Sequence, residues 1–221
     1  MTLGQALVAA AVVVAAVDWY AVARGNRGAE YVLKPLTMAV LMAAAGVLAR
    51  DDPAYVTGFT IAALVLSLAG DVFLMVPRDL FVAGLASFLL AHVAYIAAFN
   101  PTPPPLVPTL VGTAVALAVA VPLYLRFVRG MRATNRMALA GPVAVYVLAI
   151  TAMVVSAVAT TGRSDWSSGE SSLAIAGAVL FYASDGMIGW SRFVGDFPGS
   201  RIAIMATYHL AQVLLVLALL G

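Results

Sequence analysis

The sequence predicts an all-α membrane protein, a bundle of eight transmembrane helices. Hydrophobic residues make up 63% of the 221 residues and charged residues 10%, whereas soluble domains have about 45–50% apolar and about 25% charged residues. The apolar residues fall into eight runs, each close to the roughly 20 residues that a helix needs to cross a bilayer. The breaks between the runs are too short to hold another domain. We therefore expect residues 1–221 to form a single integral membrane domain, with no nucleic-acid partner.

The eight expected helices follow one another through short polar connections. The first apolar run has no basic segment before it, so we interpret it as a membrane helix and not as a cleaved signal. The second run is short and can be extended backwards through Tyr31. The sequence Asn-Pro-Thr-Pro-Pro-Pro at 100–105 predicts a stiff, polyproline-like connection. The expected helices cover residues 3–22, 33–49, 55–76, 80–99, 106–127, 138–160, 171–191 and 201–220.

The distribution of basic residues predicts how the bundle is oriented. Ten of the twelve lysine and arginine residues lie in or beside connections that follow odd-numbered helices, and only Arg50 and Arg163 lie in the others. Because lysine and arginine collect on the cytoplasmic side of membrane proteins, we expect the odd-numbered connections in the cytoplasm and both termini outside. Trp19, Tyr20 and Trp190 then lie near the cytoplasmic boundary, and we interpret them as interfacial aromatic residues.

Two carboxylates, Asp71 and Asp185, lie inside runs that should be buried in the membrane. A charged side chain at the centre of a bilayer costs roughly 3 kcal/mol even on lenient insertion scales. Asp71 is six residues before Pro77 and Asp185 is seven before Arg192, so both should lie about 9–10 Å from the same end of the bundle. The matched depth predicts that they line one cavity in the cytoplasmic half of the bilayer. A structural role as hydrogen-bonding groups between helices is the open alternative.

Other polar residues lie at helical spacing around the two carboxylates. Residues three or four apart share a helix face, and the group comprises His92, Tyr95, Tyr182, Ser184, Tyr208, His209 and Gln212. The third and fourth helices carry an Asp and then a His, and so do the seventh and eighth. This similarity is compatible with a parallel repeat of four plus four helices, although the sequences match poorly elsewhere.

Asp18 and Lys34 lie at the same end of the bundle as the carboxylates. Asp18 is six residues before Arg24, close enough to the boundary to be solvated or paired with Lys34. Lys34 itself could extend to the surface or bind a lipid phosphate, and we place both residues among the substrate-binding candidates. We expect four further acidic residues to be solvated loop charges: Asp51, Asp52, Asp165 and Glu170.

Several other kinds of site can be tested against the sequence. The chain has no cysteine, which excludes disulfides, thiolate metal sites and a cysteine nucleophile. It also lacks the Gly-x-Ser-x-Gly, Gly-x-x-x-x-Gly-Lys and His-Glu-x-x-His patterns. A metal site of two His and two Asp remains open from residue types alone, but none of these residues have close ligand spacing. We therefore expect no metal.

Together, five segments of the chain resemble the YhhN-type lysoplasmalogenase family over nearly its whole length. The segments are Lys34-Pro-Leu36, Gly70-Asp-Val-Phe-Leu-Met75, Phe81 to Tyr95 with His92, Phe181-Tyr-Ala-Ser-Asp185, and Tyr208 to Gln212. The resemblance implies a membrane hydrolase, expected in a bacterial inner membrane. It implies cleavage of the vinyl-ether bond of a lysophospholipid within the bilayer, without a cofactor. His209 occupies a position that is not a fixed histidine in that family, so His92 is the stronger candidate.

The implied reaction suits two carboxyl groups. A vinyl ether is hydrolysed by protonation at carbon, which gives an oxocarbenium ion, followed by attack of water. One aspartic acid could supply the proton while the other stabilises the cation and activates water, so we assign Asp71 and Asp185 as catalytic and the surrounding polar residues as supporting. A transporter would instead need polar groups at all depths, and a lipid-binding protein without turnover is a third interpretation.

A reporter fused to the C-terminus tests the predicted orientation. Because ten of the twelve basic residues lie at the odd-numbered connections, a reporter that works only outside the cytoplasm should be active at this position. The same reporter inserted after residue 134 should be inactive. Activity of a cytoplasm-dependent reporter at the C-terminus would contradict the orientation.

Overall fold

The computed structural model describes residues 1–49 and 53–221 as a bundle of helices. Within these residues, eight helices are long and apolar enough to cross a membrane, which confirms the predicted fold class. They are α1 (Leu3–Ala23), α2 (Arg27–Leu48), α3 (Ala54–Met75), α4 (Phe81–Phe99), α5 (Leu106–Ala133), α6 (Ala140–Ala159), α7 (Ser168–Phe193) and α8 (Ser200–Leu220). Short 3-10 turns, η1 (Met137–Leu139) and η2 (Thr160–Gly162), flank α6. The predicted charges at Arg50, Asp51 and Asp52 lie outside the described residues.

Two helices begin earlier than the apolar pattern predicts, because polar side chains cap them. The side chain of Asn26 accepts a hydrogen bond from the backbone N–H of Ala29, so α2 starts at Arg27 and not near residue 33. Ser167 and Glu170 form a capping box at the start of α7. Glu170 therefore belongs to the first turn of a helix, whereas the sequence suggested a loop charge.

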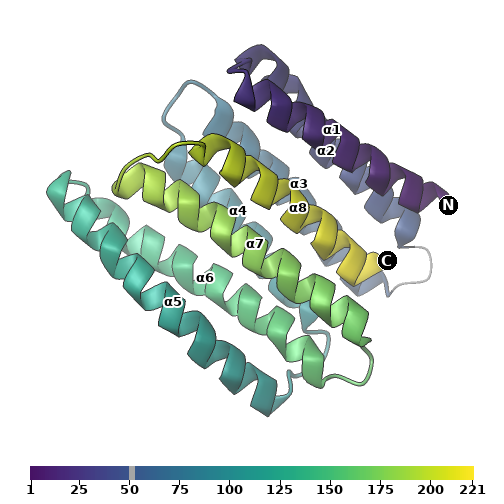
Figure 1. Cartoon of the computed structure of the whole chain (residues 1–221). Coiled ribbons are helices and arrows are strands. Elements are labelled where there is room, and N and C mark those ends of the chain that lie inside the picture. The colour runs from purple at the N-terminus through teal and green to yellow at the C-terminus, as the bar shows by residue number, and fades with distance from the viewer. Residues whose placement is uncertain (50–52) are drawn as a thin grey trace.

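Neighbouring helices form antiparallel hairpins, and two of these hairpins make the centre of the bundle (Figure 1). The α3–α4 and α7–α8 hairpins lie side by side, with α1 and α2 on one side and α5 and α6 on the other (Figure 1). Both termini lie at one end (Figure 1). We call the opposite end the basic end; there α1 connects to α2, α3 to α4, α5 to α6, and α7 to α8. The four-plus-four repeat stays a prediction.

Small residues let the central helices approach closely, as expected in a membrane bundle. A Cβ atom added at Gly177 on α7 would lie 2.9 Å from a side-chain carbon of Leu215 and 3.2 Å from the carbonyl oxygen of Ala211 on α8. One added at Gly70 on α3 would lie 2.6 Å from the ring of Phe88 on α4. Large apolar side chains such as Leu148 are exposed on the outside of the bundle, where lipid would contact them.

The close contact at Gly177 can be tested by a single methyl group. Gly177→Ala should lower the free energy of unfolding by about 1–3 kcal/mol, because a buried contact must be pushed apart. Gly58→Ala is the matched control, since nothing lies within 4 Å of a Cβ at that helical position. Thermal unfolding in detergent measures both variants. Equal stability of the two would show that α7 and α8 can separate without cost.

Candidate functional site

Asp185 on α7 is bound by side chains from two other helices. Its Oδ2 accepts a hydrogen bond from the hydroxyl of Tyr146 on α6 and lies 3.1 Å from Nε2 of His92 on α4. His92 is fully buried, and its Nδ1 lies 3.2 Å from the sulfur of Met153 on α6. The structure thus joins two predicted residues with Tyr146, which the sequence analysis missed. Its only signal was that it is the single tyrosine in the run 138–160.

Asp71 on α3 is enclosed by a different set of partners. Its Oδ1 lies 2.7 Å from the ammonium of Lys34 on α2, and its Oδ2 accepts a 2.6 Å hydrogen bond from the hydroxyl of Tyr208 on α8. The side chains of both ions are largely buried. Lys34 therefore neutralises Asp71, and it neither extends freely to the surface nor pairs with Asp18.

The remaining predicted residues connect helices away from the two carboxylates. Tyr95 on α4 donates a 2.5 Å hydrogen bond to Oε1 of Gln212 on α8. The hydroxyl of Ser184 on α7 donates to the carbonyl oxygen of Ile204 on α8 at 3.0 Å. The hydroxyl of Tyr182 is buried without a hydrogen-bond partner among the described residues. Tyr95, Gln212 and Ser184 therefore hold α8 against its neighbours.

His209 and Asp18 lie near α1 and contact neither carboxylate. The indole Nε1 of Trp19 donates to Nδ1 of His209 at 3.1 Å, so the proton of a neutral His209 is on Nε2. Trp19 thus hydrogen-bonds inside the bundle, whereas the sequence suggested an interfacial residue. Asp18 is fully buried, and neither of its carboxylate oxygens has a partner in the described part of the chain. The structure therefore contradicts both alternatives that the sequence left open for Asp18, solvation and pairing with Lys34.

An aromatic wall lies between the two carboxylate clusters. The ring of Phe181 on α7 contacts His92, with centroids 4.8 Å apart, and Tyr208, with centroids 5.5 Å apart. Phe88 on α4 packs edge-on against both Phe181 and Tyr208. The wall keeps the Asp185 cluster and the Asp71 cluster close together but in separate surroundings.

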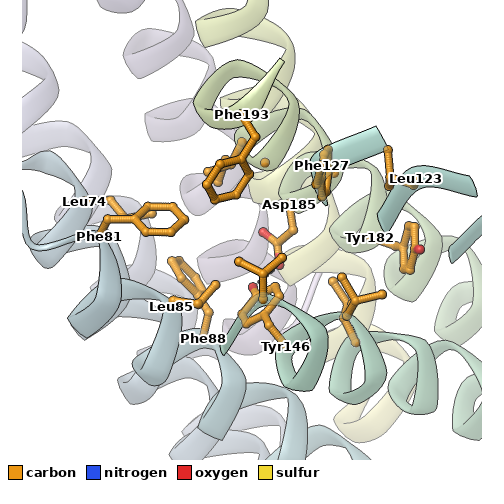
Figure 2. Close-up of a pocket in the computed structure, with 16 residues that line it drawn as sticks. Leu74, Phe81, Leu85, Phe88, Leu123, Phe127, Tyr146, Tyr182, Asp185 and Phe193 are labelled. Carbon is orange, nitrogen blue, oxygen red and sulfur yellow. Dashed lines mark hydrogen bonds between the residues drawn. The ribbon is translucent and has the colours of Figure 1, made fainter. Parts of the chain in front are cut away.

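Asp185 lines a cavity between the helices. A mostly apolar space of about 50 Å³ lies in front of the Asp185 carboxylate (Figure 2). Aromatic side chains surround it: Phe81, Phe88, Phe127, Tyr146, Tyr182 and Phe193 (Figure 2). A bound water needs about 10–15 Å³ of such space, so a few waters fit. Asp71 does not line this cavity, because Lys34 and Tyr208 enclose its carboxylate. The prediction that both carboxylates line one cavity is therefore wrong.

A groove on the outside of the bundle adjoins this cavity. It lies between α5 and α7, measures about 590 Å³, and is lined by apolar residues together with the ring of Trp190. Three residues, Leu123, Tyr182 and Gly186, line both the groove and the cavity. We call this surface the lipid groove. The lipid groove could hold an apolar chain that extends from the bilayer to the cavity lined by Asp185.

The structure does not assemble the two-His, two-Asp metal site that residue types left open. In residues 1–49 and 53–221, no group of three or more His, Asp or Glu side chains is close enough to hold a metal ion. His92 meets one carboxylate, Asp185, and His209 meets none.

The burial of the Lys34–Asp71 ion pair predicts how substitutions at these two residues change the free energy of unfolding. Asp71→Asn should lower the free energy of unfolding by about 3 kcal/mol, because it leaves a largely buried ammonium without a counter-ion. Lys34→Met combined with Asp71→Asn should regain most of that loss, since the amide oxygen can still accept from Tyr208. Thermal unfolding in detergent measures both. Asp165→Asn, which removes an exposed carboxylate that pairs with Arg163, should change little. A double variant no more stable than Asp71→Asn would contradict the pairing.

Comparisons with known proteins assign the chain to a family. The model of the YhhN family matches residues 29–219. Lysoplasmalogenase TMEM86B of Homo sapiens is 36% identical over 160 residues, which is 72% of this chain and 62% of that protein. The lysoplasmalogenase of Mycobacterium bovis is 34% identical over 184 residues, 81% of this chain and 66% of its own length.

The chain spans less than two thirds of the length of these curated relatives. No solved structure matches it. The family match nevertheless covers most of the chain and all the polar residues around Asp71 and Asp185. The chain belongs to the YhhN family.

Proposed function

We propose that this protein hydrolyses lysoplasmalogens in the membrane, giving a fatty aldehyde and a glycerophospho-alcohol. The observation that carries the proposal is the position of Asp185, a carboxyl group held by His92 and Tyr146 at the wall of an apolar cavity. The names of the relatives support the substrate class. The adjoining lipid groove supports entry of a long apolar chain from the bilayer.

The first step is transfer of a proton to carbon. The Asp185–His92 pair holds one proton, which it gives to the vinyl carbon that is farther from the ether oxygen. The electrons of the double bond form the new C–H bond, and the ether oxygen shares its lone pair to give an oxocarbenium ion. The carboxylate that remains lies in an apolar cavity, where its charge stabilises the cation more strongly than it would in water.

The second step is addition of water. A water molecule in the cavity attacks the oxocarbenium carbon, and its proton returns to the Asp185–His92 pair. The resulting hemiacetal loses the glycerol oxygen as an alcohol and leaves an aldehyde. One water is consumed and no electrons are exchanged, so the residues present are sufficient. A small, mostly apolar cavity suits this step because it has room for only a few waters.

Asp71 has a different part in this proposal. Its partners Lys34 and Tyr208 enclose it, and Tyr208 packs against the aromatic wall behind the cavity. Asp71 therefore acts as a positioning residue, which holds Tyr208 and, through it, the ring of Phe181 behind the cavity. A direct catalytic role, as the sequence suggested, would need the substrate to displace Lys34.

Aldehyde release from lysoplasmalogen by the purified protein tests the proposal. Asp185→Asn should lower the rate by about 10²–10⁴-fold, as expected for loss of a positioned acid or base. Tyr146→Phe, which removes only the hydroxyl, should lower it by about tenfold. The exposed Asp165→Asn is the control and should keep full activity.

Three results would count against this assignment. Full activity in a folded Asp185→Asn protein would remove Asp185 from the reaction. Loss of activity with EDTA, restored by zinc, would replace the carboxyl mechanism with a metal-dependent one. In the stable Lys34→Met/Asp71→Asn background, complete inactivity with intact substrate binding would return Asp71 to a direct catalytic role.

A further inference from the structure

A polar basin lies at the basic end of the bundle, beside the cavity. Its charged lining consists of Glu30, Lys34, Arg78, Asp79, Arg192 and Arg201, and its volume is about 280 Å³. Three apolar residues, Leu74, Phe81 and Ile188, line both the basin and the cavity in front of Asp185. The basin therefore adjoins the cavity, and the cavity adjoins the lipid groove.

The basin has an excess of positive charge. Four basic residues line it against two acidic ones, and because Lys34 is paired with Asp71, Arg78 is the source of the excess. Arg192 pairs with Asp79 at 2.6 Å and Arg201 with Glu30 at 2.5 Å. The hydrogen bond from Arg192 lowers the pKa of the Asp79 carboxyl, so this pair stays ionised at neutral pH.

Two basic side chains in the basin have unused hydrogen-bond donors. Arg78 is exposed and forms no ion pair within the described residues. Arg192 has a buried Nε–H without an acceptor in the same part of the chain. Its guanidinium lies 4.8 Å from the ring centre of Phe81, one of the residues that separate the basin from the cavity. Free donors beside the cavity suit an anionic oxygen-rich group.

We propose that the basin binds the phosphate of the lysophospholipid, with Arg78 as its principal ligand. This inference rests on the proposed function. The three adjoining spaces match the three parts of such a lipid: the phosphate in the basin, the vinyl ether beside Asp185, and the chain in the lipid groove. Arginine binds phosphate through two parallel hydrogen bonds. Lys34, the phosphate ligand suggested by the sequence, is instead occupied by Asp71.

A binding experiment that needs no turnover tests the phosphate site. The probes are a saturated alkyl-ether lysophospholipid, which cannot be hydrolysed at a vinyl ether, and the alkylglycerol of the same chain length, which lacks the phosphate. Each is titrated into the purified full-length chain in detergent. Tryptophan fluorescence reports binding, because Trp190 lines the lipid groove. The measured quantity is the ratio of the two affinities.

The wild-type protein should bind the phosphate-bearing lipid at least about tenfold more tightly, as a charge-assisted hydrogen bond provides. Arg78→Gln should reduce this preference to within about threefold while leaving alkylglycerol affinity unchanged. Arg78→Lys should retain part of it, because a charge remains without the paired donors. Arg129→Gln, an exposed arginine that does not line the basin, is the matched control and should retain all of it.

Two outcomes would overturn the assignment. One is an undiminished phosphate preference in Arg78→Gln. The other combines two measurements: inorganic phosphate binds the wild type but not Arg78→Gln, and both proteins show the same preference for the phosphate-bearing lipid. The basin would then bind free phosphate and not a lipid headgroup. A wild-type protein that shows the preference but releases no aldehyde would contradict the proposed reaction alone.

Discussion

The structure depends on how two carboxylates are accommodated in apolar surroundings. Lipid chains offer no hydrogen bonds, so a buried polar group must find its partners within the protein. Asp71 on α3 is bound from α2 and α8, and Asp185 on α7 is bound from α4 and α6. The carboxylate of each central hairpin is therefore bound by a side chain of the other: Asp71 of the α3–α4 hairpin by Tyr208 on α8, and Asp185 of the α7–α8 hairpin by His92 on α4. This exchange fixes the rotation of four helices about their axes.

The same requirement makes the two carboxylates unequal. The ammonium beside Asp71 neutralises it, and the group is closed off. Asp185 has no lysine or arginine partner within the described residues, and its neighbours are a tyrosine and a histidine that can share a proton with it. It also faces a space large enough for a few waters. For these reasons we propose Asp185 as the reacting group and Asp71 as a positioning residue that contacts the site through Tyr208 and Phe181.

The surroundings of Asp185 change from polar to apolar along one direction. Arginine and acidic side chains line the basin, aromatic rings line the cavity, and aliphatic residues with one tryptophan line much of the groove. A lysophospholipid has the same order of polarity along its length. Placing the reactive bond between a charged region and an apolar one would hold it near Asp185 through groups that do not react.

The sequence by itself determined the number of membrane helices and most of the buried polar residues of the candidate site. Composition and the lengths of apolar runs are local properties, and a carboxylate in such a run is conspicuous because it is costly. For these reasons the eight spans, Asp71, Asp185 and His92 could be predicted. The start of α2 was missed because its capping residue, Asn26, lies in a polar stretch that reads as a loop.

Only the tertiary structure decided which residues meet. In a soluble helix, the polar face identifies the outside, but in a membrane both the lipid-facing and the core-facing residues are apolar, so the sequence does not reveal how each helix is rotated. Lys34 could therefore not be assigned to Asp71 in preference to Asp18, nor Tyr146 to Asp185. Trp19 could not be distinguished from an interfacial residue, although it hydrogen-bonds to His209 on α8. Such pairings join residues far apart in the chain, and packing between helices alone sets them.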